Sequence, residues 1–409
     1  MDFVVQKYGG TSVGSLERIN RVADHVAATR AGGVNVVVVV SAMGEQTDDL
    51  IDMARALSKD PPRRELDMLL TAGERITMAL LSIALHERGL KSVSLTGSQS
   101  GILTDETHGN ARIEKILGDR IRTGLQENSI VIVAGFQGVS PKTKEITTLG
   151  RGGSDLSAVA LASVLGAQRC ELYKDVDGVF TADPRVVPGA RKIDSLPWYA
   201  MSELAWAGAG VLHARAAHVA ARFGLVAEIR SSFKPQLGGT LIEPATGLDV
   251  DMSTSKHGME QATLHAIASK SKMCLLEIET GAGDAVKLNP AVLEFLWANG
   301  EAPAVNQQVG SVTRLVVPEN LAAAIKDGLA GGRFAAVRAK SVKLSMAGMS
   351  AVTVVGNGFL QNPETVAQLL SAASTAGEVM LWDVRNHALM VGVKDAEAPK
   401  VVQALHALF

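Results

Sequence analysis

The feature that most constrains the fold is the run from Val34 to Val40, which contains almost nothing but valine. Such an uninterrupted apolar run is typical of a strand buried on both faces. The segment 130–134, Ile-Val-Ile-Val-Ala, has the same character. Segments 16–30 and 64–88, in which apolar residues have helical spacing, lie between such strands. Strands alternating with helices predict a mostly parallel sheet covered by helices.

Two glycine-rich turns, far apart in the sequence, each contain a positively charged residue. The first, Lys-Tyr-Gly-Gly-Thr-Ser-Val at residues 7–13, directly follows the apolar run 3–5. The second, at residues 147–155, directly precedes the helix-like run 156–165. A glycine turn after a strand or before a helix points backbone N–H groups at an anion. In a parallel sheet such turns meet beyond the carboxyl ends of the strands, where ligands bind. Together the turns predict a phosphoryl-transfer enzyme.

The charged residues of the two turns suit different anions. Lys7 ends a buried strand beside two glycines, which suits the neutralisation of a transferring phosphate. Arg151 has glycines on both sides, so its guanidinium is suited to grip a carboxylate through two hydrogen bonds. Ser154 and Asp155 fall where a helix N-cap belongs, and capping is one interpretation of both. Asp155 is also placed to hold Lys7.

Further polar residues lie between the turns. Ser41 and Thr47 belong to a segment that follows the valine run, again at the carboxyl end of a strand. Glu74 lies in an otherwise apolar helix, where it is either paired with Arg75 or open to a cationic ligand.

The segment 173–185 is a turn-rich loop with three aspartates. A calcium site is one interpretation, but the loop lacks the alternation and terminal glutamate of an EF-hand. A nucleotide pocket fits better. Its aspartates would bind ribose hydroxyls, Lys174 and Arg185 would bind phosphates, and Phe180 or Tyr173 would lie against a base.

The C-terminal part contains a weak repeat. A stretch rich in Asp, Ser, Thr and Gly at 244–258 reads as a linker. Beyond it, a strand-like run, a glycine-containing loop, an Asn-Pro pair, a helical run and Gly-Glu occur twice. The pairs at 289–290 and 362–363 predict helix starts, with asparagine as N-cap. Two βαββαβ-like units fit this pattern, and one irregular α+β domain is the alternative.

Composition excludes several classes of protein. A chain of 409 residues with 47% hydrophobic residues predicts two or three domains. A formal net charge of −2 argues against a broad nucleic-acid-binding surface. We expect no transmembrane helix and no signal peptide, because no long uncharged apolar segment and no basic start is found. Cys170 and Cys274 are expected to be buried thiols in a reducing cytoplasm.

The segments 7–13, 149–155 and 175–185, in this order and spacing, resemble the aspartate kinase (aspartokinase) family. The resemblance implies an amino-acid-kinase fold over 1–245, a linker at 246–262, and ACT-like domains at 263–338 and 339–409. It implies transfer of phosphate from ATP to the side-chain carboxylate of L-aspartate, giving 4-phospho-L-aspartate. This is the first step toward lysine, threonine and methionine. It also implies Mg²⁺, bound mainly through the nucleotide phosphates.

The resemblance also implies roles for individual residues. Lys7 would stabilise the γ-phosphate and Asp155 would organise the site. Glu74 would hold the ammonium of aspartate and Arg151 its α-carboxylate. The remaining substrate residues would be Thr47, Gly152, Gly153 and Ser154. The ATP-binding set would be Lys7, Tyr8, Gly9, Gly10, Ser41, Lys174, Asp175, Phe180, Thr181, Asp183, Pro184 and Arg185.

The chain departs from the family pattern at two places. Gly210 stands where the family often has a nucleotide-binding lysine, so we expect weaker ATP binding or a substitute cation. Pro290-Ala291 and Pro363-Glu364 stand where ACT domains usually present Pro-Gly to an amino-acid effector. A side chain there opposes close approach, and a carboxylate opposes the carboxylate of the effector. Feedback inhibition by lysine or threonine is therefore expected to be weak, absent or retuned.

Two other functions stay open at this point. One is a related kinase of the same fold that acts on glutamate, acetylglutamate, carbamate or UMP. The other is a ligand-sensing pseudo-kinase, for which Gly210 is the main argument. The exposed sheet edges of ACT-like domains predict at least a homodimer.

Overall fold

The computed structural model describes residues 2–245, 262–332, 334 and 337–409, which form two compact units. The first unit contains the residues up to Val179 together with 192–198 and 211–245. The second contains 180–191, 199–210 and the C-terminal residues. Two segments that the predicted boundary at 245 assigns to the first domain thus belong to the second unit. The predicted linker lies outside the described residues, except for Ala262.

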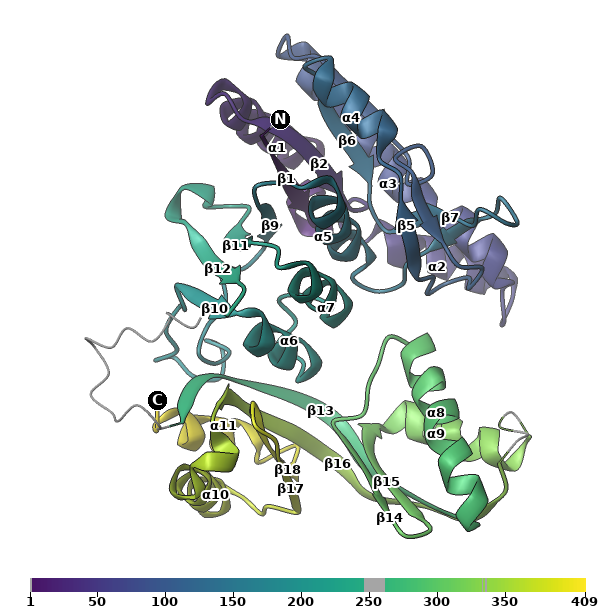
Figure 1. Cartoon of the computed structure of the whole chain (residues 1–409), viewed down its shortest axis with the longest axis vertical. Coiled ribbons are helices and arrows are strands. Elements are labelled where there is room, and N and C mark those ends of the chain that lie inside the picture. The colour runs from purple at the N-terminus through teal and green to yellow at the C-terminus, as the bar shows by residue number, and fades with distance from the viewer. Residues whose placement is uncertain (1, 246–261, 333, 335–336) are drawn as a thin grey trace. The chain divides into compact units, whose positions relative to one another are not determined.

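The first unit is built on an eight-stranded sheet in the order β10-β12-β11-β9-β1-β2-β6-β3 (Figure 1). Every pair of neighbours is parallel except β11 and β12. The valine run forms β2, next to β1, and confirms the prediction of a buried strand. The strands are β1 (Phe3–Tyr8), β2 (Asn35–Val40), β3 (Ser92–Leu95), β6 (Ile130–Ala134), β9 (Cys170–Lys174), β10 (Ser195–Pro197), β11 (Ala227–Ser231) and β12 (Gly239–Glu243).

Helices cover both faces of this sheet (Figure 1). Because side chains alternate along a strand, Val36, Val38 and Val40 share one face with Tyr8, and α1 and α3 pack on that face. Helices α4 and α5 contact β2 as well, and α5 also contacts β1 and β9. The helices of this unit are α1 (Leu16–Ala31), α2 (Gln46–Leu57), α3 (Arg63–Glu87), α4 (Asp119–Gln126), α5 (Gly153–Leu165) and α7 (Ala214–Phe223), whereas α6 (Trp198–Trp206) belongs to the second unit except for its first residue.

A second, four-stranded sheet in the first unit has the order β5-β4-β7-β8. Its strands are β4 (Ile102–Thr104), β5 (Ile113–Ile116), β7 (Gln137–Val139) and β8 (Ile146–Thr148). Strand β8 packs against α3 and leads directly into the second glycine turn. This small sheet therefore positions the turn that carries Arg151.

Helix α3 is the one helix in the described part of the chain that is long and apolar enough to cross a membrane by length and composition. Its buried residues include Asp67, Glu74 and Thr77, and it packs against α1 and the main sheet. These features are typical of the core helix of a folded domain.

The second unit contains one six-stranded antiparallel sheet in the order β14-β15-β13-β16-β18-β17. Two helices and one apolar cluster belong to each half, which confirms the predicted repeat of ACT-like α+β units. The elements are β13 (Thr263–Thr280), α8 (Ala282–Ala298), β14 (Val305–Val309), β15 (Val312–Pro318), α9 (Glu319–Ala330), β16 (Ala339–Asn357), α10 (Pro363–Ala376), β17 (Leu381–Val384), β18 (Ala388–Lys394) and α11 (Ala398–His406). The division between residues 338 and 339 falls directly before β16 and stays a prediction.

The two predicted helix starts of the repeat have different outcomes. Helix α10 begins at Pro363 with Asn362 as its N-cap residue, as predicted. Helix α8 begins at Ala282, so Pro290 lies inside it and the predicted start at Asn289 is wrong. Leu288, Val292 and Leu296 are spaced by four residues and fully buried. Their burial outweighs the cost of about 3 kcal/mol for proline in a helix interior.

Candidate active site

Strand pairing brings two lysines to the same face of the sheet. Strands β1 and β9 are parallel neighbours, with Lys7 opposite Leu172 and Tyr8 opposite Tyr173. Because side chains alternate, Lys7 and Lys174 emerge on one face, whereas the two tyrosines emerge on the other. The Lys7 side chain is buried, with a residue exposure of 5%. Strand β1 extends through Tyr8, so Lys7 lies within the strand and the turn begins at Gly9.

Asp155 joins the two lysines. Its Oδ1 lies 2.7 Å from Lys7 Nζ, and Lys174 Nζ donates to its Oδ2 at 2.5 Å. Helix α5 begins at Gly153 and Gly152 is its N-cap residue, so Ser154 and Asp155 lie in the first turn and the capping interpretation is wrong. A carboxylate in the first helical turn is stabilised by the helix dipole. The ion pair expected between Lys7 and Asp155 is present.

Burial and charge shift the pKa values of this cluster in defined directions. Burial alone would raise the pKa of Asp155, but Lys174 and Lys7 more than offset it and hold that pKa well below its usual value. Burial lowers the pKa of Lys7 to about 8, against the opposing effect of Asp155. Lys7 is therefore mostly charged at neutral pH.

Glu74 is a buried carboxylate with one unsatisfied oxygen. Its residue exposure is 3%, and its Oε1 accepts a hydrogen bond from the backbone N–H of Ala42 at 3.0 Å. Its Oε2 is buried and has no hydrogen-bond partner among the described residues. Burial raises the pKa of Glu74 to about 7, although Ala42 and Lys7 oppose the shift. No ion pair with Arg75 occurs within the described part of the chain, which leaves the interpretation of an open cation site.

Arg151 is exposed, and it makes neither a hydrogen bond nor an ion pair with any residue that the structure describes. An exposed guanidinium at the tip of a glycine turn is free to bind a carboxylate through two parallel hydrogen bonds. Ser154 and Gly153, on the helix side of the same turn, are buried.

Gly152 is the glycine of this turn that the geometry requires. Its φ is +66°, and a Cβ added there would lie 2.3 Å from Cβ of His213. We expect Gly152→Ala to displace the turn, lowering kcat/KM for the acceptor about 10²-fold and stability by about 1–3 kcal/mol. Steady-state kinetics and thermal denaturation measure both effects.

Gly166→Ala is the matched control, because Gly166 ends the same helix at φ +73° with no described atom within 4 Å of its added Cβ. It should cost about 1 kcal/mol of strain and leave kinetics unchanged. Equal kinetic losses in both variants would contradict the argument.

The first glycine turn packs closely against the segment after β2. A Cβ on Gly10 would lie 3.0 Å from the carbonyl oxygens of Ala42 and Gly44, and one on Gly9 would lie 3.4 Å from Lys7 Nζ. Ser41 is half-buried, and its backbone N–H donates to Tyr8 O at 3.2 Å.

Thr47 is half-buried in the first turn of α2 and not in a loop, because the loop after β2 ends before Gln46.

The interpretation that places Tyr173 against a base is wrong, whereas the assignment of Tyr8 to the ATP-binding set stays a prediction that its side chain does not serve. The rings of Tyr8 and Tyr173 stack on each other with centroids 4.7 Å apart, and both residues are buried. Tyr8 OH also lies 2.6 Å from His25 Nδ1. The cause is strand alternation, which places these rings on the face opposite Lys7 and leaves neither available to a base.

The rest of the predicted nucleotide loop is divided between the units. Lys174 and exposed Asp175 end the β9 region of the first unit, whereas Phe180, Thr181, Asp183, Pro184 and Arg185 belong to the second. There, Thr181 Oγ1 lies 2.8 Å from His406 Nε2, and Arg185 pairs with Asp183 at 2.7 Å. Contacts of this loop with a nucleotide stay a prediction.

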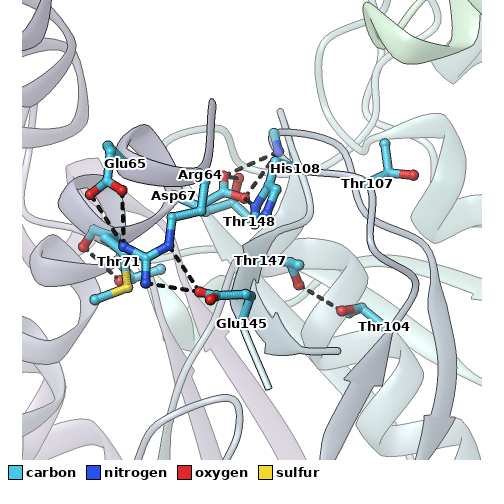
Figure 2. A network of polar contacts seen from close by, with 12 residues as sticks. Arg64, Glu65, Asp67, Thr71, Thr104, Thr107, His108, Glu145, Thr147 and Thr148 are labelled. Atoms are coloured by element: carbon cyan, nitrogen blue, oxygen red, sulfur yellow. Dashed lines mark hydrogen bonds and ion pairs between the residues drawn. The ribbon is translucent and has the colours of Figure 1, made fainter. Parts of the chain in front are cut away.

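The buried charged residues of the first unit that the sequence did not reveal include Asp67 and Arg215. Asp67 belongs to a network of polar contacts that Figure 2 shows. Its place in an apolar helix, at helical spacing from Glu74, was the signal that could have revealed it. No comparable pattern surrounds Arg215.

Comparison with known proteins agrees with this geometry. The model of the amino acid kinase family matches residues 2–231. An aspartokinase from Mycolicibacterium smegmatis is 41% identical over 100% of this chain and 96% of its own length. One from Geobacillus stearothermophilus is 40% identical over 100% of this chain and 97% of its own.

Solved structures resemble the whole chain. Aspartokinase III of E. coli in complex with aspartate and ADP has a TM-score of 0.80 and covers 99% of both chains, and at 23% identity it shows the fold alone. The aspartate kinase from Synechocystis is 32% identical, with a TM-score of 0.55, and matches 99% of this chain and 69% of that one. The chain therefore belongs to the amino acid kinase family and, within it, to the aspartokinases.

Proposed function

We propose that the protein transfers the γ-phosphoryl group of ATP to the side-chain carboxylate of L-aspartate, giving 4-phospho-L-aspartate and ADP. The observation that carries the proposal is the pair of lysines fixed by Asp155 beside a buried glutamate with an unsatisfied oxygen. The aspartokinase relatives and the E. coli aspartokinase III complex with aspartate and ADP support the choice of substrates.

The reaction needs charge stabilisation and positioning, and no general base. The attacking carboxylate has an ordinary pKa of about 3.9, so it is ionised at neutral pH. One of its oxygens forms the bond to the γ-phosphorus while the bond to the bridging oxygen of ADP breaks. Lys7 and Lys174 offset the repulsion between the two anions, and Asp155 keeps both ammonium groups in place.

The ammonium and the α-carboxylate of aspartate suit the two side chains of the site that have an unoccupied binding group, Glu74 and Arg151. The ammonium would supply the missing partner of Glu74 Oε2, and Arg151 would grip the α-carboxylate. Thr47, Gly152, Gly153 and Ser154 would complete the acceptor site.

Mg²⁺ fits this site as an ion that binds together with the nucleotide. Both oxygens of Asp155 are engaged by lysines, so the cluster suits an ion held mainly by phosphate oxygens. When bound in that way, Mg²⁺ neutralises part of the triphosphate charge.

The dependence on pH should be a narrow bell. Glu74 must be ionised to hold an ammonium, so its pKa of about 7 makes kcat/KM for aspartate rise as pH increases through that value. Lys7 must be protonated, so its pKa of about 8 makes kcat/KM fall as pH increases further. Steady-state rates from about pH 5.5 to about 9.5 measure the profile. The low-pH limb should disappear in Glu74→Gln, and its persistence there would contradict the assignment.

In the first unit, the nucleotide is expected to bind through Gly9, Gly10, Ser41, Lys174 and Asp175. Gly210 has a φ of +70° and no described atom within 4 Å of an added Cβ. A lysine would be strained by that backbone, so Lys174 is the expected substitute cation.

Regulation by an amino acid is proposed for the ACT-like unit. The expectation that feedback inhibition is weakened now rests on Glu364 and no longer on Ala291. Ala291 lies inside α8 and not at its start, where Gly281 and Gly283 flank the first residue instead. Glu364 does lie in the first turn of α10 and opposes an effector carboxylate there. Lysine is named in the complex of E. coli aspartokinase III with lysine and aspartate. A homo-oligomer and a cytoplasmic location complete the proposal.

The deciding experiment measures ATP-dependent ADP formation with L-aspartate, beside L-glutamate, acetylglutamate, carbamate and UMP as acceptors, with Mg²⁺ present, and uses hydroxamate formation to identify an acyl phosphate product. Turnover with aspartate and with none of the other acceptors supports the proposal. Turnover with another acceptor points to a related kinase, and ATP binding without turnover points to the pseudo-kinase.

A further inference from the structure

A buried carboxylate outside the lysine cluster, Asp67, lies where the helix that carries Glu74 meets the strand that leads to Arg151. Its exposure is 0%. Asp67 precedes Glu74 by seven residues, which is about two helical turns, so both lie on the same face of α3. Thr148 ends β8, which packs against α3, and it precedes Arg151 by three residues.

Both oxygens of Asp67 are engaged, and each partner belongs to another segment. Thr148 Oγ1 donates to Oδ1 at 2.5 Å, and His108 Nδ1 lies 2.6 Å from Oδ2 (Figure 2). The backbone N–H of Gly109 also donates to this carboxylate, at 3.1 Å. One side chain therefore ties together α3, the end of β8 and the loop 105–112 between β4 and β5.

The same loop is held by Arg215 of α7, whose exposure is 6%. Arg215 donates to Asn110 Oδ1 at 2.6 Å, to Leu149 O at 2.5 Å and to Ala111 O at 2.7 Å. The backbone N–H of Ala111 in turn donates to Thr148 O at 2.8 Å. Both the side chain and the backbone of the strand end are thus fixed directly before the exposed glycine turn.

We propose that Asp67 is a positioning residue that sets the spacing between Glu74 and Arg151, and so restricts the acceptor to an amino diacid of the length of aspartate. The inference rests on the proposed function. An acceptor held by its ammonium and its α-carboxylate presents its second carboxylate at a distance from Lys7 that its chain length fixes. Glutamate held at the same two groups is one methylene too long, and a misplacement of about 1 Å costs about 10²-fold in rate.

The test variant is Asp67→Asn, which keeps the size of the side chain and removes its charge and one acceptor. We expect KM for aspartate to rise about tenfold and the kcat/KM preference for aspartate over glutamate to fall about tenfold. KM for ATP should stay within about twofold, because the ATP-facing lysines are anchored by Asp155 instead. Thr148→Val, which removes the opposing donor, should give the same pattern, and Thr148→Ser should restore the wild-type values.

Thr104→Val is the matched control. Thr104 Oγ1 lies 2.6 Å from Thr147 Oγ1, so the variant also removes a buried hydroxyl of the small sheet, but one that does not contact Asp67 (Figure 2). It should leave both Michaelis constants and the acceptor preference unchanged.

The outcomes separate this inference from the proposed function. A wild-type protein without aspartate-dependent turnover refutes the function itself. An active wild-type enzyme whose folded Asp67→Asn and Thr148→Val variants keep KM for aspartate and the acceptor preference refutes the positioning role. The third outcome is a fall in kcat together with equal rises of KM for aspartate and KM for ATP in these variants, and a lowered Tm. It would show that Asp67 has a purely structural role, and it would refute the positioning role as well.

Discussion

Replacing Lys7 with methionine is expected to lower kcat for aspartate phosphorylation about 10³-fold. The methionine fills the buried space but carries no charge to offset the developing negative charge on the phosphoryl oxygens. Folding should persist, because Asp155 keeps its second partner, Lys174, at 2.5 Å. Single-turnover and steady-state kinetics with ATP and aspartate measure the effect, and thermal denaturation verifies the fold.

Lys91→Met is the control for Lys7→Met. Lys91 is an exposed lysine paired with Glu127 at 3.1 Å, so its loss should change stability by no more than about 1 kcal/mol and leave kcat unaltered. A Lys7→Met enzyme with wild-type turnover would exclude Lys7 from charge stabilisation.

Removing the carboxylate of Asp155 should damage both stability and activity. Asp155→Ala leaves the buried ammonium group of Lys7 and the half-buried one of Lys174 without their counterion, at an expected cost of about 3–5 kcal/mol. The pKa of Lys7 then falls below its present value of about 8, since Asp155 is what raises it against burial. Folded molecules therefore lose the cation near neutral pH, and kcat should fall about 10²-fold or more. Urea unfolding and initial rates on the same preparation measure the two effects.

The sign of the pH effect on stability follows from the same pair. The pKa of Asp155 is depressed in the folded protein, so its contribution to the free energy of unfolding is complete above its ordinary pKa and is lost as pH falls toward the depressed value.

Asp119→Ala is the control for Asp155→Ala, because Asp119 also lies in the first turn of a helix but its side chain is 84% exposed. A loss there as large as in Asp155→Ala would assign the effect to the helix dipole instead.

The fold was predictable where one physical rule dominated. Five consecutive valines leave no polar face toward water, so the burial of β2 in a parallel sheet followed from its sequence alone. The start of α8 was not predictable, because the local preference of Asn289-Pro290 competed with the burial of apolar residues that lie on both sides of it. Such a competition is decided by tertiary packing, which the local pattern does not contain.

The candidate site was predictable for residues whose chemistry conflicts with their surroundings. A lysine in a buried strand and a glutamate in an apolar helix both needed a partner, which identified Lys7 and Glu74. The face of Tyr173 was misjudged because motif spacing does not state which way a strand side chain points. Arg215 was missed because its partners, chiefly backbone carbonyl oxygens, have no signature in the sequence.

The chain passes from the first unit to the second at residue 180, returns at 192, leaves at 199, returns at 211, and finally leaves after 245. Ala182 and Val187, on the first of these excursions, are 2% and 6% exposed within the core of the second unit. A fragment cut at residue 245 would carry these apolar residues without the cluster that buries them. The catalytic and ACT-like halves are therefore not separable modules, and exchanging regulatory halves between relatives would require three segments to be transplanted together.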